Sequence, residues 1–302
     1  MEHAVLGAGA IGGLVGTAVA SLGEDVTVLV RPGRLPGYPA NLSVERPSGV
    51  IAAPAKAAAT LTKPVDVLWI ATRTYQLEPA LDAVQSLPRC IVPLLNGVDH
   101  IELLRARFCR GHVGNDRVLP ATIVVEGEKI APGRFVQRSP FVNLNLGASG
   151  EPLLGAIVVR LRDLGFTCKF IDNEQTLLWS KLCFLGPFAL VTSASGMNKA
   201  EIYANPEWKR KLIFAIAEAC AVAKASGAGV ETAQIQSIFD GLPPGMRSSM
   251  QKDLAAGRQL ELDAIGGPIA RGGERYGIDV STTAALIADI RALSKANSTA
   301  SS

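Results

Sequence analysis

Three glycines near the start of the chain have the spacing of a phosphate-binding turn. Gly7, Gly9 and Gly12 follow the short apolar run His3–Leu6, and apolar residues at helical spacing begin at Ile11. In such a turn the first glycine permits a tight bend, the second lets a pyrophosphate approach the backbone, and the third lets the helix lie near the strand. The helix N-terminus offers unpaired N–H groups to an anion. The pattern indicates a dinucleotide site, the alternative being a glycine turn that packs strand on helix without a ligand.

The end of the second strand distinguishes between the two nicotinamide dinucleotides. NAD sites usually carry Asp or Glu about 20 residues past the glycines, where the carboxylate accepts a hydrogen bond from the ribose 2′-OH. Here the strand Val26–Val30 ends in Arg31, Arg34 follows, and no carboxylate is present. A guanidinium suits a 2′-phosphate through paired, charge-assisted hydrogen bonds. We therefore expect NADP(H) rather than NAD(H), the alternative being that Arg31 is an ordinary solvated residue.

A nicotinamide delivers hydride, but a carbonyl that becomes an alcohol also needs a proton donor or another group that stabilises its oxygen. Such sites usually lie in a crevice beside the cofactor domain, so we expect the donor at or after Asp172. Lys181 lies among strongly apolar residues. It either extends to water or occupies a cleft with a lowered pKa. On a helix, Glu261 and Asp263 point about 200° apart, so one is expected to face inward.

The first part of the chain has the alternating strands and helices of a mainly parallel sheet. Residues 118–146 contain β-branched residues and an alternating residue pattern, and these features favour β-hairpins over helices. The expected strands and helices of this part, in chain order, are Val65–Ile70, a helix within Thr72–Ser86, Cys90–Leu95, Ile101–Phe108, Leu153–Leu164 and Phe166–Ile171.

From Asn173 onward the strand signals end and helical periodicity takes over. The expected helices are Gln175–Leu185, Pro206–Ser226, Thr232–Phe239, Leu260–Tyr276 and Val280–Leu293, and the two serines at 248 and 249 lie in a loop or helix start. The fold class expected is therefore α/β, with a Rossmann-type dinucleotide-binding domain over residues 1–172 and an all-helical substrate and catalytic domain over residues 173–302.

Composition excludes several classes of protein. The 302 residues are 48% hydrophobic and 19% charged, with a net charge of +3 and 5% aromatic residues. Scattered charges and few aromatics argue against binding nucleic acid, and no uncharged apolar run has the length of a membrane span. The five widely spaced cysteines have no metal-ligand pattern and indicate reduced thiols in a cytoplasmic protein. Apolar helical faces make a homodimer plausible.

The chain resembles the ketopantoate reductase (2-dehydropantoate 2-reductase) family, part of the 6-phosphogluconate dehydrogenase-like group of NADP enzymes. The similarity runs nearly end to end and depends on the joint order of motifs that are individually weak. These motifs are Gly7–Gly12, Arg31, Ile70–Gln76, Leu94–Val98, Leu178–Leu182 and the stretch from Ser248 to Asp263.

The resemblance implies roles for these residues. It implies that Lys181 is the general acid that protonates the carbonyl oxygen and that Glu261 binds the substrate or orders the site. It implies that Ser249 binds the substrate carboxylate and that Asn96 contacts nicotinamide or substrate. The cofactor-binding residues it implies are Gly7, Gly9, Ala10, Ile11, Gly12, Arg31, Arg73 and Asn96, with arginine at position 73 where the family usually has lysine.

Two positions depart from the family pattern. The family carries two asparagines after the catalytic lysine, and here those positions are Leu185 and Ala189. Two hydrogen-bonding groups that would hold a polar substrate are therefore absent, which implies a more apolar pocket. Three hypotheses stay open: an NADPH-dependent 2-keto acid reductase that makes (R)-pantoate from ketopantoate in pantothenate biosynthesis, a related oxidoreductase with a more apolar carbonyl substrate, and a non-catalytic NADP-binding sensor.

Overall fold

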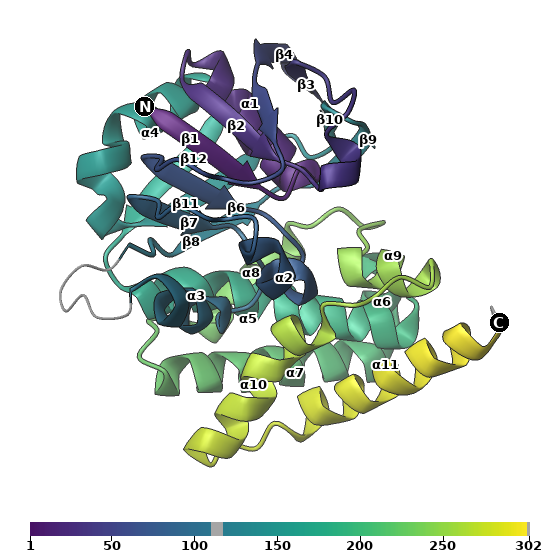
Figure 1. The fold of residues 1–302 in the computed structure, drawn as a ribbon. Helices are drawn as coiled ribbons and strands as arrows, with labels where there is room; N and C mark the ends of the chain where they lie inside the picture. Colours follow the sequence, from purple (N-terminus) through teal and green to yellow (C-terminus); the bar gives the residue numbers. More distant parts are fainter. Residues whose placement is uncertain (110–116, 301–302) are drawn as a thin grey trace. The chain divides into compact units, whose positions relative to one another are not determined.

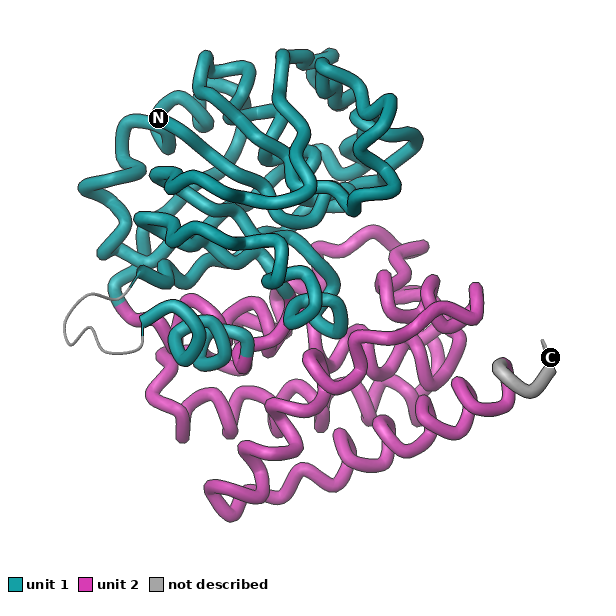
Figure 2. The backbone as a smooth tube through the Cα atoms, in the orientation of Figure 1, with its two compact units in different colours: residues 1–95, 100–172 teal, residues 96–99, 173–302 magenta. Residues whose placement is uncertain are grey.

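The computed structural model describes residues 1–109 and 117–300 (Figure 1). They form two compact units, which Figure 2 colours separately. The first unit contains residues 1–95 and 100–172. The second contains residues 173–302 together with the short segment 96–99, which follows a strand of the first unit in the chain but packs with the helices of the second.

The first unit is built on a sheet of five parallel strands. Apolar strands that are buried on both faces are typical of parallel sheets covered by other elements. In spatial order the strands are β5 (Lys56–Ala58), β2 (Asp25–Leu29), β1 (Glu2–Leu6), β6 (Val67–Ile70) and β7 (Cys90–Pro93). The chain leaves β1 towards β2 on one side and later returns to β6 on the other, so the strand order reverses at β1. In open α/β sheets, ligands bind at the carboxyl ends of the strands beside such a reversal.

The helix α1 (Ala10–Ser21) is buried around nearly its whole circumference. It contacts β1 and β2 of the parallel sheet and also β3 (Asn41–Arg46), β4 (Gly49–Pro54) and β10 (Arg134–Gln137) of a second sheet. A helix covered on all sides is expected to be apolar throughout. A Cβ at Gly13 would lie 2.2 Å from the Phe135 ring on β10, so the close approach requires glycine. The second sheet has the order β4 (Gly49–Pro54), β3 (Asn41–Arg46), β10 (Arg134–Gln137) and β9 (Gly127–Ala131).

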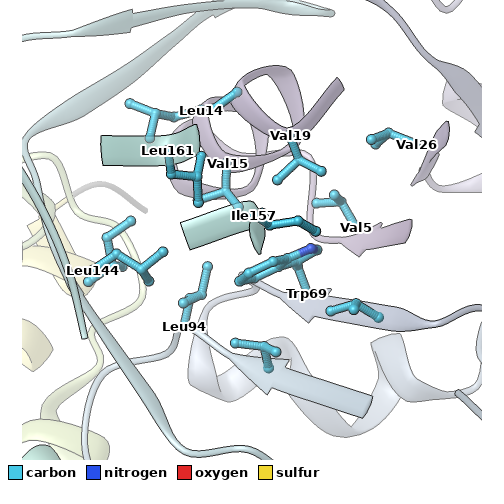
Figure 3. Close-up of a cluster of buried hydrophobic side chains, with 14 of the residues drawn as sticks. Val5, Leu14, Val15, Val19, Val26, Trp69, Leu94, Leu144, Ile157 and Leu161 are labelled. Carbon is cyan, nitrogen blue, oxygen red and sulfur yellow. The ribbon is translucent and has the colours of Figure 1, made fainter. Parts of the chain in front are cut away.

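A third sheet completes the first unit, with the order β12 (Phe166–Ile171), β11 (Val142–Gly147) and β8 (Ala121–Val124). In chain order, α2 (Leu77–Leu81) lies between β6 and β7, α3 (His100–Phe108) lies between β7 and β8, and α4 (Glu151–Asp163) lies between β11 and β12. Figure 3 shows their shared core, in which Leu14 and Val15 of α1 pack with Trp69, Leu144 and Ile157. One hydrophobic core therefore fixes the position of the glycine turn relative to the sheets.

The second unit is entirely helical among the described residues. Its central helix is α5 (Glu174–Ser195), which the side chain of Asn173 caps by accepting a hydrogen bond from the Thr176 N–H at 2.7 Å. The remaining helices are α6 (Lys199–Ala204), α7 (Pro206–Ala225), α8 (Thr232–Asp240), α9 (Ser249–Ala255), α10 (Leu262–Tyr276) and α11 (Ser281–Ala300).

The helix α5 is long and apolar enough to cross a membrane when length and composition alone are considered. However, 78% of its apolar stretch is buried inside the structure, and α7, α9, α10 and α11 pack against it. We interpret α5 as the core helix of this unit, since burial by neighbouring helices accounts for its composition.

The hairpins expected over 118–146 and the helical character of the second part are confirmed. The predicted helix Gln175–Leu185 was too short, because α5 continues through Pro187 to Ser195. Proline removes one helical hydrogen bond, and Pro187 is tolerated where neighbouring helices bury it. The strands β3, β4 and β5 and the helix α6 were not expected.

Candidate active site

The glycine turn has a geometry that only glycine fits. Gly7 has φ +103°, in the left-handed region, and a Cβ there would lie 2.7 Å from the carbonyl carbon of Ala71. A Cβ at Gly12 would lie 2.1 Å from the Gly7 carbonyl oxygen. The turn is therefore compressed between the start of α1 and the chain that leaves β6, and neither position accepts a Cβ unless the backbone shifts.

Gly9 differs, because a Cβ there would meet no atom within 4 Å. It is the N-cap of α1 and makes no side-chain capping bond, and the first turn carries no acidic residue. The backbone N–H groups of Ala10 and Ile11 are among those without a partner inside the helix. Open space beside uncompensated N–H groups suits an anion, so the turn fits the pyrophosphate of a dinucleotide.

Two arginines follow the strands on either side of β1. Arg31 comes after β2, is exposed, and begins the short 3₁₀ turn Pro32–Arg34. Arg73 comes after β6, is half-buried, and begins the 3₁₀ turn Thr74–Gln76. Because all strands are parallel, both arginines follow strand ends at the same edge of the sheet as the glycine turn. This places two positive charges on the edge that faces the ligand in such folds.

Asn96 makes a contact within the helical unit. Its Nδ2 donates a hydrogen bond to Oε2 of Glu261 at 3.1 Å. The next residue, Gly97, has φ +83°, and a Cβ there would lie 2.3 Å from the Ala264 carbonyl oxygen on α10. The segment 96–99 is therefore in close contact with the start of α10.

An arginine on α10 secures the same segment. Arg271 donates hydrogen bonds to Asp263 on its own helix, at 2.9 Å, and to Asp99, at 2.5 Å. Sequence reasoning missed Arg271, and no pattern could have identified the contact, because Asp99 and Arg271 lie 172 residues apart. Through this guanidinium, the Asp99 end of the segment is held to α10, the helix that Glu261 precedes.

Glu261 is the N-cap residue of α10, and only 5% of its surface is exposed. The Asp263 side chain is 79% exposed, so the expectation that one acid faces inward and the other outward is confirmed. Glu261 does not lie within the helix, however, but at its boundary. A buried carboxylate needs compensating partners, and the Asn96 amide is one of them.

Lys181 lies half-buried on α5. Burial lowers the pKa of Lys181 to about 8, and the negative charge of Glu261 opposes this shift. The two helices meet closely nearby, since a Cβ at Gly186 of α5 would lie 3.0 Å from the Ile269 side chain of α10. An ammonium with a pKa near neutrality, beside a buried carboxylate, is suited to general acid catalysis.

The two serines differ in position. Ser248 is buried and caps α9, accepting a hydrogen bond from the Gln251 N–H at 3.1 Å. Its hydroxyl also lies 2.7 Å from that of Thr192 on α5. Ser249 is the first residue of α9 and is exposed. The expectation that the two serines lie at a loop or helix start is therefore confirmed. Ser248 attaches the start of α9 to α5, and the Ser249 hydroxyl stays accessible.

Two apolar residues follow Lys181 along its helix. Leu185 is half-buried, and Ala189 is fully buried. Residues four apart on a helix are neighbours on one face, so Leu185 lies one turn beyond Lys181. Among residues 1–109 and 117–300, no group of three or more His, Cys, Asp or Glu side chains could hold a metal ion.

A parallel sheet with a glycine turn, followed by a helical unit, is the fold of a class of nicotinamide-dependent oxidoreductases that act on CH–OH groups. The family models for ketopantoate reductase PanE/ApbA and for its C-terminal part match residues 3–151 and 173–294. A 2-dehydropantoate 2-reductase of Caulobacter vibrioides is 31% identical, with 96% of this chain and 98% of that protein covered. The chain belongs to the ketopantoate reductase family.

Solved structures share this fold at lower identity. A 2-dehydropantoate 2-reductase from Methylococcus capsulatus matches with a TM-score of 0.86 and 21% identity, over 99% of this chain and 98% of that one. A ternary structure of D-mandelate dehydrogenase with NADH and anilino(oxo)acetate matches with a TM-score of 0.83 and 22% identity, over 99% of this chain and 100% of that one. The same architecture therefore occurs in enzymes with different substrates.

Proposed function

We propose that this chain uses NADPH to reduce a 2-keto acid to a 2-hydroxy acid, and that ketopantoate, giving (R)-pantoate in pantothenate biosynthesis, is the first candidate substrate. The observation that carries the proposal is Lys181 itself, a partly buried lysine on α5 whose pKa burial lowers to about 8, while the charge of the buried Glu261 opposes that shift. A binding protein without catalysis has no need of such a group. Membership of the family supports the same reaction.

NADP(H) is proposed over NAD(H) because positive charge follows β2 where an NAD site usually has a carboxylate. Arg31 is exposed at this position, and Arg73 follows the neighbouring strand β6. Guanidinium groups bind phosphate through parallel, charge-assisted hydrogen bonds. The glycine turn, with Gly7, Gly9 and Gly12, and the N–H groups of Ala10 and Ile11 would hold the pyrophosphate.

In this mechanism the bound reduced nicotinamide supplies the hydride that adds to C2 of the keto acid. Lys181 donates its proton to the carbonyl oxygen as negative charge develops there. Glu261 keeps Lys181 charged and accepts a hydrogen bond from Asn96. Ser249 binds the substrate carboxylate, and Asn96 orients the substrate or the nicotinamide ring.

We further propose that residues 1–172 are the cofactor-binding domain and residues 173–302 the substrate domain, in a cytoplasmic homodimer. The thiols of Cys168, Cys183 and Cys220 are buried and unoxidised, which supports a reducing compartment. Ile213 and Phe214 on α7 are 41% and 52% exposed and provide an apolar surface for a second copy.

The test is NADPH oxidation followed by absorbance with a panel of 2-keto acids, for the wild type and for Lys181→Ala. Turnover of ketopantoate that is lost in the variant is the expected result. Binding of NADPH without turnover of any carbonyl would show a non-catalytic sensor and contradict the proposal.

A second candidate function is the reduction of a bulkier, more apolar 2-keto acid. The observation that favours it is the apolar pair Leu185 and Ala189 where the family has asparagines, since these side chains cannot hydrogen-bond a hydroxylated substrate. The structurally similar D-mandelate dehydrogenase was solved with anilino(oxo)acetate, a ligand with an aromatic group. In the same panel, turnover of aromatic or branched keto acids without turnover of ketopantoate would support this candidate.

A further inference from the structure

The hairpin strand β9 passes beside the glycine turn. It is the edge strand of the second sheet and pairs antiparallel with β10. A Cβ at Gly127 of β9 would lie 3.5 Å from the Cβ of Ala10, the first residue of α1. Side chains of β9 are therefore within reach of the turn that fits the cofactor phosphates.

Lys129 on β9 reaches that turn directly. Its Nζ donates a hydrogen bond to the carbonyl oxygen of Ala8 at 2.9 Å, and Ala8 lies between Gly7 and Gly9. The residue is exposed, and Ala8 is the one hydrogen-bond partner of its Nζ among the described residues. A lysine ammonium has three N–H donors, so two of them remain available to a ligand.

The charges around this ammonium are positive. Partial burial of the ammonium lowers the pKa of Lys129, and the guanidinium of Arg34 lowers it further. The nearby N-terminus of α1 carries partial positive charge. The adjacent carboxylate Glu128 is paired elsewhere, with Arg138 at 2.7 Å. Like charges brought together without a counter-charge repel one another, and a bound anion would relieve this repulsion.

The position of Arg34 indicates which part of a dinucleotide would supply the anion. Arg34 ends the 3₁₀ turn that follows β2, the place where the adenosine ribose of a dinucleotide lies in this class of fold. We propose that Lys129, together with Arg31 and Arg34, binds the 2′-phosphate of NADP(H) and so contributes to discrimination against NAD(H). The proposal rests on the proposed use of NADP(H) and adds a residue from the hairpin to the two arginines that follow β2.

Direct binding measurements test it. Dissociation constants of NADPH and NADH are measured by calorimetry for the wild type, Lys129→Met and Lys129→Arg. Methionine keeps the apolar stem of the side chain and removes the charge. We expect Lys129→Met to weaken NADPH binding about tenfold, as for the loss of one charge-assisted hydrogen bond. NADH binding should change less than about twofold, and Lys129→Arg should restore most of the NADPH affinity.

The matched control is Lys169→Met, which removes an exposed lysine from β12 of the same unit. It should leave both dissociation constants unchanged. Equal weakening of NADPH and NADH in Lys129→Met, or no change in either, would overturn the proposal. A wild type that binds NADH more tightly than NADPH would instead contradict the proposed cofactor, so the two failures are distinguishable. Thermal unfolding of each variant shows whether the hairpin remains folded.

Discussion

Asn96 and Glu261 are joined by a hydrogen bond of 3.1 Å from the Asn96 amide to the Glu261 carboxylate, across 165 residues of sequence. Through this bond a residue that follows the last strand of the parallel sheet contacts the start of a helix near the end of the chain. Glu261 also acts electrostatically on Lys181. Three residues implied separately by family resemblance therefore form one interacting group in the helical unit.

The charge of Glu261 should be visible in the pH profile. It raises the pKa of Lys181, which burial otherwise lowers. A general acid must be protonated, so kcat/KM should fall as pH rises through about 8. Glu261→Gln removes the charge, and the alkaline limb should move towards lower pH by roughly one unit.

The measurement is kcat/KM against pH for both proteins, with Glu274→Gln as the control, because Glu274 is an exposed carboxylate of α10. An alkaline limb at the same pH in the wild type and Glu261→Gln would contradict the electrostatic role.

The glycine turn allows a matched pair of substitutions. Gly12→Ala places a methyl group against the Gly7 carbonyl and should destabilise the protein by about 2 kcal/mol or more. Gly9→Ala places its methyl group in open space, so folding should be unchanged while the methyl group keeps the pyrophosphate away from the backbone.

Chemical denaturation and calorimetric titration with NADPH separate the two effects. We expect lost stability for Gly12→Ala and an affinity at least about tenfold weaker for Gly9→Ala. Unimpaired NADPH binding by Gly9→Ala would show that the cofactor phosphates do not lie at this turn.

The sequence predicted the glycine turn and the parallel strands well, because their signals are local. It did not predict β3, β4 and β5, because these strands contain residue types that are depleted in strands, among them Asn, Glu, Lys, Ala and Pro. It also placed the end of the central helix near Leu185, since Pro187 is a helix breaker in isolation. The contacts of Asn96 with Glu261 and of Lys129 with Ala8 join distant parts of the chain, and only the fold brings such residues together.

Arg271 should act as a positioning residue. The side chains in its ion pairs with Asp99 and Asp263 are about half exposed or more exposed than that. Ion pairs between exposed side chains contribute about 1 kcal/mol or less to stability. Arg271→Ala should therefore unfold nearly as the wild type does, but it should free the segment 96–99 and lower kcat/KM about tenfold through misplacement of Asn96.

A double-mutant cycle with Asp99→Asn checks this relationship. If Arg271 acts through Asp99, the losses in kcat/KM in the two single variants should not add in the double variant. Additive losses would contradict the proposed link.

Leu185 offers a test of substrate choice. Leu185→Asn restores a hydrogen-bonding side chain one turn beyond Lys181 and should raise kcat/KM for ketopantoate about tenfold relative to an aromatic 2-keto acid. The control is Leu293→Asn, at an exposed leucine of α11. An unchanged ratio between the two substrates would indicate that Leu185 does not contact the substrate.

The central claim is that Lys181 protonates the carbonyl oxygen, and rapid-mixing measurement of NADPH oxidation in a single turnover tests it most directly. For Lys181→Ala the account predicts a rate roughly 10²–10⁴-fold lower, an NADPH dissociation constant within about twofold of the wild type, and partial recovery of the rate when a small primary amine is added. A single-turnover rate within about tenfold of the wild type, unaffected by the amine, would contradict the account.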